Sequence, residues 1–220
     1  MIRQWIEIFS VIDAISIGML LTTLAMNSVR RIETCLKAYT MNSLLLALLM
    51  GVCAIYMGIA HLYIAAAVTL ISKGIVIPYL LRRVVRSLRL TRDAEPYIGT
   101  TMSLVISAVL VVIVYSSLSK GIVVEGVIEN TLKISISIIL IGLFIMITRK
   151  KAVTQVIGLL FMENGLFLAG FSLTYGMPTL IELGVLFDLL MGVIILGVFL
   201  SQIKKAFVSV DLDRLTTLKG

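Results

Sequence analysis

The sequence has few of the side chains that carry enzyme chemistry or bind metal ions. Its 220 residues include two cysteines and one histidine, whereas an iron–sulfur cluster or a structural zinc ion takes about four ligands. Cys35 and Cys53 are separated by about 27 Å if they lie on one helix, too far for a disulfide. We also find no Gly-rich phosphate loop and no nucleophile placed beside a base. These shortages argue against a stand-alone enzyme and predict a chain without a cofactor or metal of its own.

Charged residues are also scarce. They make up 14% of the chain, against 60% hydrophobic residues, and Ala38 to Ser72 contains no Asp, Glu, Lys or Arg. That stretch alone is long enough to cross a bilayer twice, since one helical crossing takes about 20 residues. Glu7 and Asp13 interrupt the first apolar stretch, so we expect a retained first helix rather than a signal peptide. The sequence therefore predicts an all-α, polytopic membrane protein without a second, water-soluble domain.

The net charge of +7 does not indicate a nucleic-acid partner. Binding to nucleic acid needs a basic face with base-reading or stacking side chains, whereas the basic residues here lie between apolar runs. Lys and Arg at the cytoplasmic ends of membrane helices account for the charge. We therefore expect the lipid bilayer, and no nucleic acid, as a partner.

Dividing the chain at its charge clusters gives about seven candidate spans. They cover 5–28, 38–58, 62–81, 98–118, 129–148, 152–174 and 179–203. Basic residues gather in alternate loops and in the tail, where they include Arg30, Arg31, Arg82, Arg83, Arg86, Arg89, Arg92, Arg149, Lys150, Lys151, Lys204 and Lys205. Because cytoplasmic loops retain Lys and Arg, we expect the N-terminus outside the cytoplasm and the C-terminus inside it.

Five ionisable residues fall inside the expected spans, where each costs about 2.5–3.5 kcal/mol by insertion scales. They are Asp13, Lys73, Lys133, Glu163 and Asp188. Glu163 and Asp188 should lie near the membrane centre on consecutive helices, so they can share one buried polar site. Lys73 is their natural partner, either neutralised by burial or paired with a carboxylate.

Two roles for these residues remain open at this stage. Burial disfavours the charged form of a carboxyl group and a nearby lysine favours it, so such a group can load and release a proton. Alternatively, the buried charges only hold helices together. Asp13 suits either an entry site or a structural role, and Lys133 can snorkel outward or end a charged path.

The last third of the chain resembles a known family of membrane subunits. Ile157 to Gly165, preceded by Arg149-Lys150-Lys151, resembles the second helix of the NuoK subunit of respiratory complex I and of the related MrpC antiporter subunit. The key glutamate of NuoK follows Gly-Leu directly, where this chain has Leu160, and the acid here is Glu163, about one turn deeper. Asp188 to Gly192 resembles the third NuoK helix, with aspartate in place of glutamate.

The chain as a whole is similar to hydrogenase-4 component E (HyfE), in which extra helices precede a NuoK-like end. The stretch Lys73 to Pro78, followed by Arg82-Arg83, also resembles that family. The resemblance implies a five-helix region over 1–148 and a NuoK-like two-helix region with a cytoplasmic tail over 149–220.

This resemblance also implies a function. It would make the chain a non-catalytic subunit of a group 4 membrane-bound nickel–iron hydrogenase or formate hydrogenlyase in a prokaryotic inner membrane. Its partners would be other membrane subunits, including antiporter-like ones, and the redox centres would lie in other chains. The chain would contribute Glu163, Asp188, Lys73, Lys133 and Asp13 to a proton or sodium-ion relay. The alternatives are a membrane spacer that docks antiporter-like subunits and an MrpC-like cation/proton antiporter subunit; the lack of a clear inverted repeat argues against an independent transporter.

Overall fold

The computed structural model describes residues 2–58, 60–87, 97–118 and 127–174, together with Gly184, Gly192 and Gly197. Most of these residues are helical. In chain order the helices are α1 (Ile2–Ser28), α2 (Ile32–Met57), α3 (Ala60–Thr69), the π-helix η1 (Leu70–Val76), α4 (Ile77–Ser87), α5 (Thr100–Leu118), α6 (Val127–Thr148) and α7 (Ala152–Thr174). Since α3, η1 and α4 follow one another without a break, they form a single long crossing.

Six of the described segments are long and apolar enough to cross a membrane. They are Ser10–Ser28, Ile32–Tyr56, Leu62–Arg83, Thr100–Leu118, Glu129–Thr148 and Ala152–Leu173. The predicted class, an all-α membrane protein, is thus confirmed. The seventh expected span, 179–203, lies outside the described residues apart from three glycines, so the count of seven and the orientation stay predictions.

One predicted boundary needs correction. The second span begins at Ile32, six residues before the expected start at 38, because Glu33 and Lys37 lie on the helix rather than in a loop. The helix ends at Gly58, whose φ of 65° is left-handed and whose N–H donates to the carbonyl of Ala54. Glycine adopts this conformation without the steric penalty of a Cβ atom.

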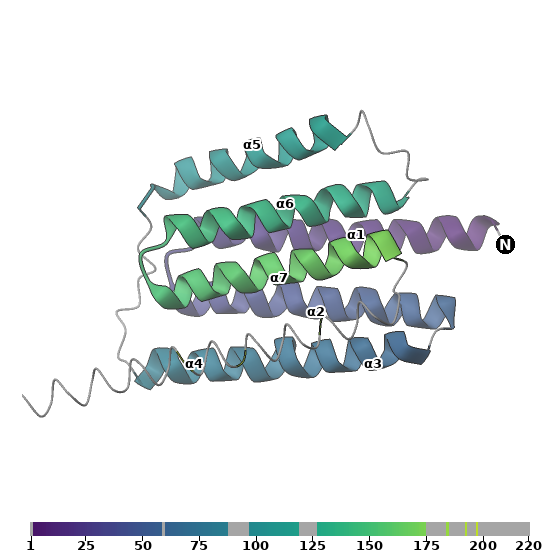
Figure 1. Ribbon diagram of the computed structural model, residues 1–220, viewed down its shortest axis with the longest axis horizontal. Coiled ribbons are helices and arrows are strands. Elements are labelled where there is room, and N and C mark those ends of the chain that lie inside the picture. The colour runs from purple at the N-terminus through teal and green to yellow at the C-terminus, as the bar shows by residue number, and fades with distance from the viewer. Residues whose placement is uncertain are drawn as a thin grey trace, which may run out of the picture.

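The helices run side by side as one bundle (Figure 1). The hairpin of α1 and α2 packs against the hairpin of α6 and α7, through α1 on α6 and α2 on α7. At one edge α5 lies along α1 and α6, and at the other edge α3, η1 and α4 lie along α2. The interior of this bundle is where buried polar side chains from distant segments meet.

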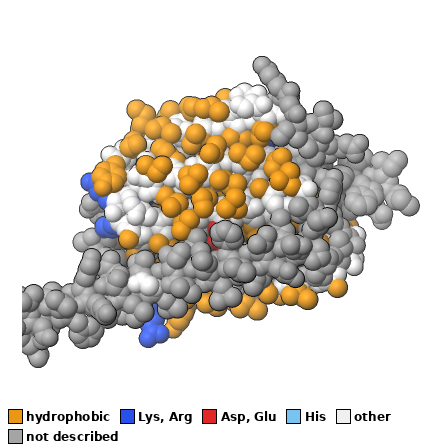
Figure 2. Space-filling view, viewed as in Figure 1, with side chains coloured by type: hydrophobic (Ala, Val, Ile, Leu, Met, Phe, Trp, Pro, Cys, Tyr) orange, Lys and Arg blue, Asp and Glu red, His pale blue; other side chains and the backbone are white. Residues whose placement is uncertain are grey.

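The bundle has one end rich in basic residues, which we call the basic end. It consists of the links between α1 and α2 and between α6 and α7, with the neighbouring turns of α2 and α4, and it carries Arg30, Arg31, Lys37, Arg82, Arg83, Arg86, Lys150 and Lys151. Figure 2 shows Lys and Arg side chains at this end and hydrophobic side chains over the flank of the bundle. An apolar flank with a charged end is the surface expected of a chain in a bilayer.

Two glycines allow α6 and α7 to approach closely. A Cβ atom on Gly142 would lie 2.7 Å from the backbone nitrogen of Met162, and one on Gly158 would lie 2.8 Å from Cγ2 of Ile145 and 3.0 Å from the backbone nitrogen of Met146. Small residues at such crossings let helix backbones pack directly in a membrane. This close contact with α6 fixes the position of α7 along the membrane normal, and with it the depth of its polar side chains in the membrane.

Candidate functional site

A buried ion pair joins two segments at the centre of the bundle. The Nζ atom of Lys73 in η1 lies 3.2 Å from Oε1 of Glu163 in α7, and the two residues are 0% and 4% exposed. Each is the twelfth residue of its 22-residue span, counted from Leu62 and from Ala152. Both charges therefore lie near the middle of the membrane thickness, where an isolated charge is most costly.

The π-helix that carries Lys73 has a cause in the sequence. Pro78 lies two residues after its end. A proline has no N–H to donate, and its ring clashes with the carbonyl four residues earlier, here that of Gly74. The switch to π-helical bonding, in which the N–H of Ile77 donates to the carbonyl of Ser72, occurs in the turn before Pro78. Short π-helical segments often lie at functional sites. The ring of Phe167 on α7 lies 5.5 Å from Nζ of Lys73, so an aromatic face also stabilises the cation.

Amide side chains extend the polar site from α7 through α2 to α1. Asn164, next to the buried carboxylate in the sequence, donates to Oδ1 of Asn42 at 3.0 Å and to Oγ of Ser43 at 3.0 Å. Asn42 in turn donates to the carbonyl oxygen of Met19 and to Oγ1 of Thr22, both at 2.8 Å. We call these side chains, with Lys73 and Glu163, the central polar network. It connects four crossings at mid-membrane, those that contain α1, α2, η1 and α7.

A second polar cluster lies at the end of the bundle opposite the basic end. Nδ2 of Asn130 lies 3.5 Å from Oδ2 of Asp13, which links α6 to α1. Lys133 is paired with Glu129 one turn away on α6, and its Nζ atom lies 5.8 Å from the ring centroid of Tyr115 on α5. Three helices therefore contribute to this cluster, which contains two of the predicted site residues.

The helix α1 contributes residues to both polar regions. Asp13 precedes Met19 by six residues, a rise of about 9 Å along a helix, and Ser16 lies between them with 0% of its surface exposed. Polar side chains thus recur along the buried face of α1 from the end of the bundle to its centre. Water or hydroxyl groups along such a line can pass protons by short steps.

Arg149 has a role that the loop pattern did not reveal. It is 1% exposed, and its guanidinium donates to the carbonyl oxygens of Met26, Asn27 and Val29 at 3.2–3.3 Å. These groups lie at the C-terminal end of α1, where helix carbonyls lack partners and attract positive charge. Burial lowers the pKa of this guanidinium from its usual value, and the side chain caps α1 instead of anchoring the chain at the lipid surface. The nearby Asn27 donates to Oγ of Ser107 at 2.8 Å, which ties α1 to α5.

The structure brings together some of the predicted site residues and leaves others apart. Lys73 and Glu163 form the central pair, Asp13 and Lys133 belong to the second cluster, and Asp188 lies outside the described residues. Sequence reasoning did not single out Asn42, although an amide inside a long run without charges was a signal for it. In the described segments no three His, Cys, Asp or Glu side chains come together, so we assign no metal site to them.

Buried charges at mid-depth in an apolar helical bundle define a multi-pass membrane protein with an internal polar site. No protein-family model matches the sequence, and no solved structure matches it significantly. The protein of Mycobacterium tuberculosis described as uncharacterized protein Rv0085 is 36% identical over 149 residues, which cover 67% of this chain and 68% of that protein. Hydrogenase-4 component E of Escherichia coli K12 is 24% identical over 209 residues, which cover 92% of this chain and 94% of that protein, and the Shigella flexneri component E matches equally.

The chain therefore belongs to the same family as the mycobacterial protein, and it is a homologue of hydrogenase-4 component E over nearly its whole length. The expected resemblance to component E is confirmed. The resemblance of 149–220 to NuoK, and the division of the chain at residue 148, stay predictions.

Proposed function

We propose that this chain is a non-catalytic subunit of a membrane-bound nickel–iron hydrogenase complex and that it takes part in ion translocation coupled to the redox reaction. The observation that carries the proposal is the pair of Lys73 and Glu163, buried at mid-membrane and continued by the central polar network. Homology to hydrogenase-4 component E supports the assignment to such a complex. The nickel and iron–sulfur chemistry then belongs to other subunits, and antiporter-like membrane subunits are the proposed neighbours.

The pair is suited to passing a proton. When the lysine is an ammonium and the glutamate a carboxylate, each charge stabilises the other in a region of low dielectric constant. Transfer of one proton from Nζ to the carboxylate leaves two neutral groups and no net change of charge, so the step avoids an unpaired buried ion. A further proton that reaches the pair through the amide and hydroxyl groups of the network changes how the proton is shared between Lys73 and Glu163. The pair can then release a proton toward the opposite side of the membrane.

Further residues extend the proposed path. Asp13 and Lys133 would serve it at the end of the bundle opposite the basic end, with Ser16 buried between that end and the centre. We keep Asp188 as a proposed second carboxylate on the basis of sequence alone. The travelling ion is a proton in this scheme; a sodium ion would need several oxygen ligands, which neighbouring subunits would have to complete.

The second candidate is a membrane spacer in which the same pair only holds η1 to α7. The hydrogen bonds that Asn42 and Asn164 make across three helices favour this candidate, since interhelical hydrogen bonds hold membrane helices together. A related alternative to the first candidate is an MrpC-like subunit. The chain would then use the same buried charges within a cation/proton antiporter complex.

Replacing Glu163 by glutamine distinguishes the relay from the spacer. Glutamine preserves shape and hydrogen bonding but has no ionisable proton, so we expect Glu163→Gln to leave subunit assembly intact and to lower ion uptake per redox turnover at least tenfold. Asp188→Asn should act in the same direction. The measurement is ion uptake into proteoliposomes that contain the whole complex, with redox turnover and subunit content determined on the same samples.

Asp93→Asn is the matched control, because it removes a carboxylate that the sequence places between two spans, and it should leave coupling unchanged. The double variant Lys73→Met, Glu163→Gln separates the two candidates further, since it removes both charges of the pair together. Normal coupling in an assembled complex with this double variant would contradict the relay and favour the spacer.

We also propose that the basic end faces the cytoplasm of a prokaryote and that the chain lies in its inner membrane, with the N-terminus outside and the C-terminus inside. A reporter fused after Gly220 should be active in the cytoplasm, and one inserted at 119–121 should be active outside. Both reporters active on the same side would contradict the three spans expected between residues 121 and 220.

A further inference from the structure

A cavity at the basic end is separate from the central polar network. It lies between the first turns of α2 and the last turns of α4, has a volume of about 160 Å³, and is lined by Ile32, Glu33, Leu36, Lys37, Arg82, Val85 and Arg86. One water takes up only about 15 Å³ of such space, so the cavity has room for a phosphate group. We call it the basic pocket.

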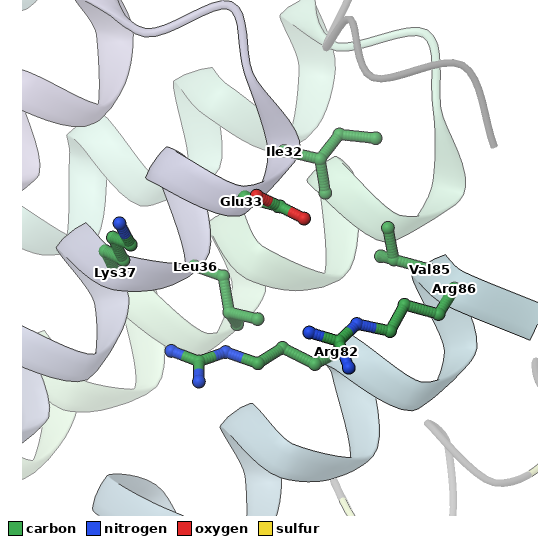
Figure 3. A pocket seen from close by; sticks show the side chains of 7 residues that line it. All are labelled: Ile32, Glu33, Leu36, Lys37, Arg82, Val85 and Arg86. Atoms are coloured by element: carbon green, nitrogen blue, oxygen red, sulfur yellow. The ribbon is translucent and has the colours of Figure 1, made fainter. Parts of the chain in front are cut away.

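The charges of the basic pocket favour an anion. Three cations, Lys37, Arg82 and Arg86, face one carboxylate, that of Glu33. In Figure 3 the two arginine side chains extend from α4 toward α2, where the other charged residues of the pocket lie. Arginine presents a planar set of donors that matches a phosphate group, and two such side chains can bind it from one side.

The start of α2 adds to this attraction. The N-cap residue, Arg31, makes no side-chain capping hydrogen bond, and its carbonyl accepts from the N–H of Thr34. The N–H groups of Ile32 and Glu33 at the start of α2 receive no side-chain cap. The positive end of the helix dipole lies at the same place. This feature reinforces the cations, which supply most of the attraction.

Depth and lining indicate which kind of anion the pocket fits. The span of α2 begins at Ile32 and the span that includes α4 ends at Arg83, so the pocket lies where hydrocarbon gives way to lipid headgroups. Val85 lines the pocket and is partly exposed, so it presents an apolar wall beside the charged rim, and the buried side chains of Ile32 and Leu36 lie in the same lining. A soluble anion gains nothing from an apolar wall, whereas a phospholipid places its phosphate at the rim and its glycerol and acyl carbons against such a wall.

We propose that the basic pocket binds the phosphate headgroup of one anionic phospholipid of the leaflet that the basic end faces. Basic pockets between membrane helices commonly bind such headgroups. The lipid would join α2 to α4 at the end of the long crossing that carries Lys73, and so hold that crossing against α2. The proposal does not depend on the ion relay.

The test uses the full chain in neutral detergent, titrated with phosphatidylglycerol or with phosphatidylcholine and followed by native mass spectrometry. We expect one phosphatidylglycerol to bind in preference to phosphatidylcholine. Arg82→Gln and Arg86→Gln should each weaken it about fivefold, and the double variant about 25-fold, since each basic residue near a membrane surface contributes a roughly equal share. Glu33→Gln should strengthen binding, because it removes the one negative charge of the pocket.

Arg83→Gln is the matched control, since Arg83 is exposed on the same helix but does not line the pocket. Equal losses from Arg83→Gln and Arg82→Gln would show diffuse attraction and overturn the proposal. Full competition by inorganic phosphate at the same concentration would also overturn it, because the apolar wall would then contribute nothing. Unchanged lipid binding in the double variant, combined with loss of neighbouring subunits from the complex, would assign the pocket to an acidic partner segment instead.

Discussion

Replacing Lys73 by methionine is expected to lower the free energy of unfolding by about 3 kcal/mol, because it removes the ammonium that lies against the buried carboxylate of Glu163. Replacing Glu163 by glutamine in the same chain should restore most of that loss, since it also removes the carboxylate of the pair. The measurement is the loss of helical signal during titration with a denaturing detergent. The double variant should unfold within about 1 kcal/mol of the original chain.

Arg83→Met provides the control for the first prediction, because it removes an exposed basic residue outside the basic pocket and should change stability by less than about 0.5 kcal/mol. A double variant as unstable as Lys73→Met alone would show that the two side chains do not act as a pair. The experiment concerns folding only, so its outcome is independent of the uptake measured in proteoliposomes.

Alanine at Gly142 should be nearly as disruptive. Its Cβ atom would lie 2.7 Å from the backbone nitrogen and 2.9 Å from the Cα atom of Met162, and backbone atoms cannot rotate away as a side chain can. We expect Gly142→Ala to lower stability by about 2–3 kcal/mol, the upper range for overpacking, by forcing α6 and α7 apart. The same titration measures it, and Gly158→Ala should behave similarly.

Gly51→Ala is the matched control for this second prediction. Gly51 lies within α2, and nothing is within 4 Å of the position its Cβ atom would take. Alanine is favoured over glycine in a helix by about 1 kcal/mol, so this variant should be as stable as the original chain or more stable. A loss of stability in Gly51→Ala equal to that in Gly142→Ala would contradict the close-packing explanation.

The sequence was sufficient to predict the membrane class and most of the spans. Lipid imposes a length and an apolar composition on every crossing, and the basic clusters mark where crossings end. The start of α2 was predicted six residues late because Glu33 and Lys37 look like loop residues. At the surface of a membrane, charged side chains on a helix can reach the headgroups, so charge marks the interface rather than the end of the helix.

Other features of the site required the three-dimensional structure. The sequence left open whether Lys73 is neutralised or paired, because its partner Glu163 lies 90 positions away and hydropathy does not determine which helices are neighbours. The π-helix is also unmarked by composition, although Pro78 suggests it in retrospect. The capping of α1 by Arg149 was hidden because the same residue fits the pattern of a basic loop.

That cap has a consequence for the order of membrane insertion. The carbonyl oxygens at the end of α1 receive their donors from a residue about 120 positions later in the chain. During synthesis at about 5–20 residues per second, Arg149 follows the end of α1 by several seconds or more. Until then these carbonyls have local donors, such as the Val29 N–H that bonds to Met26, together with water or lipid headgroups. The hairpin of α1 and α2 therefore completes its packing only when α6 has entered the membrane, and a chain truncated before residue 149 should remain dependent on the insertion machinery.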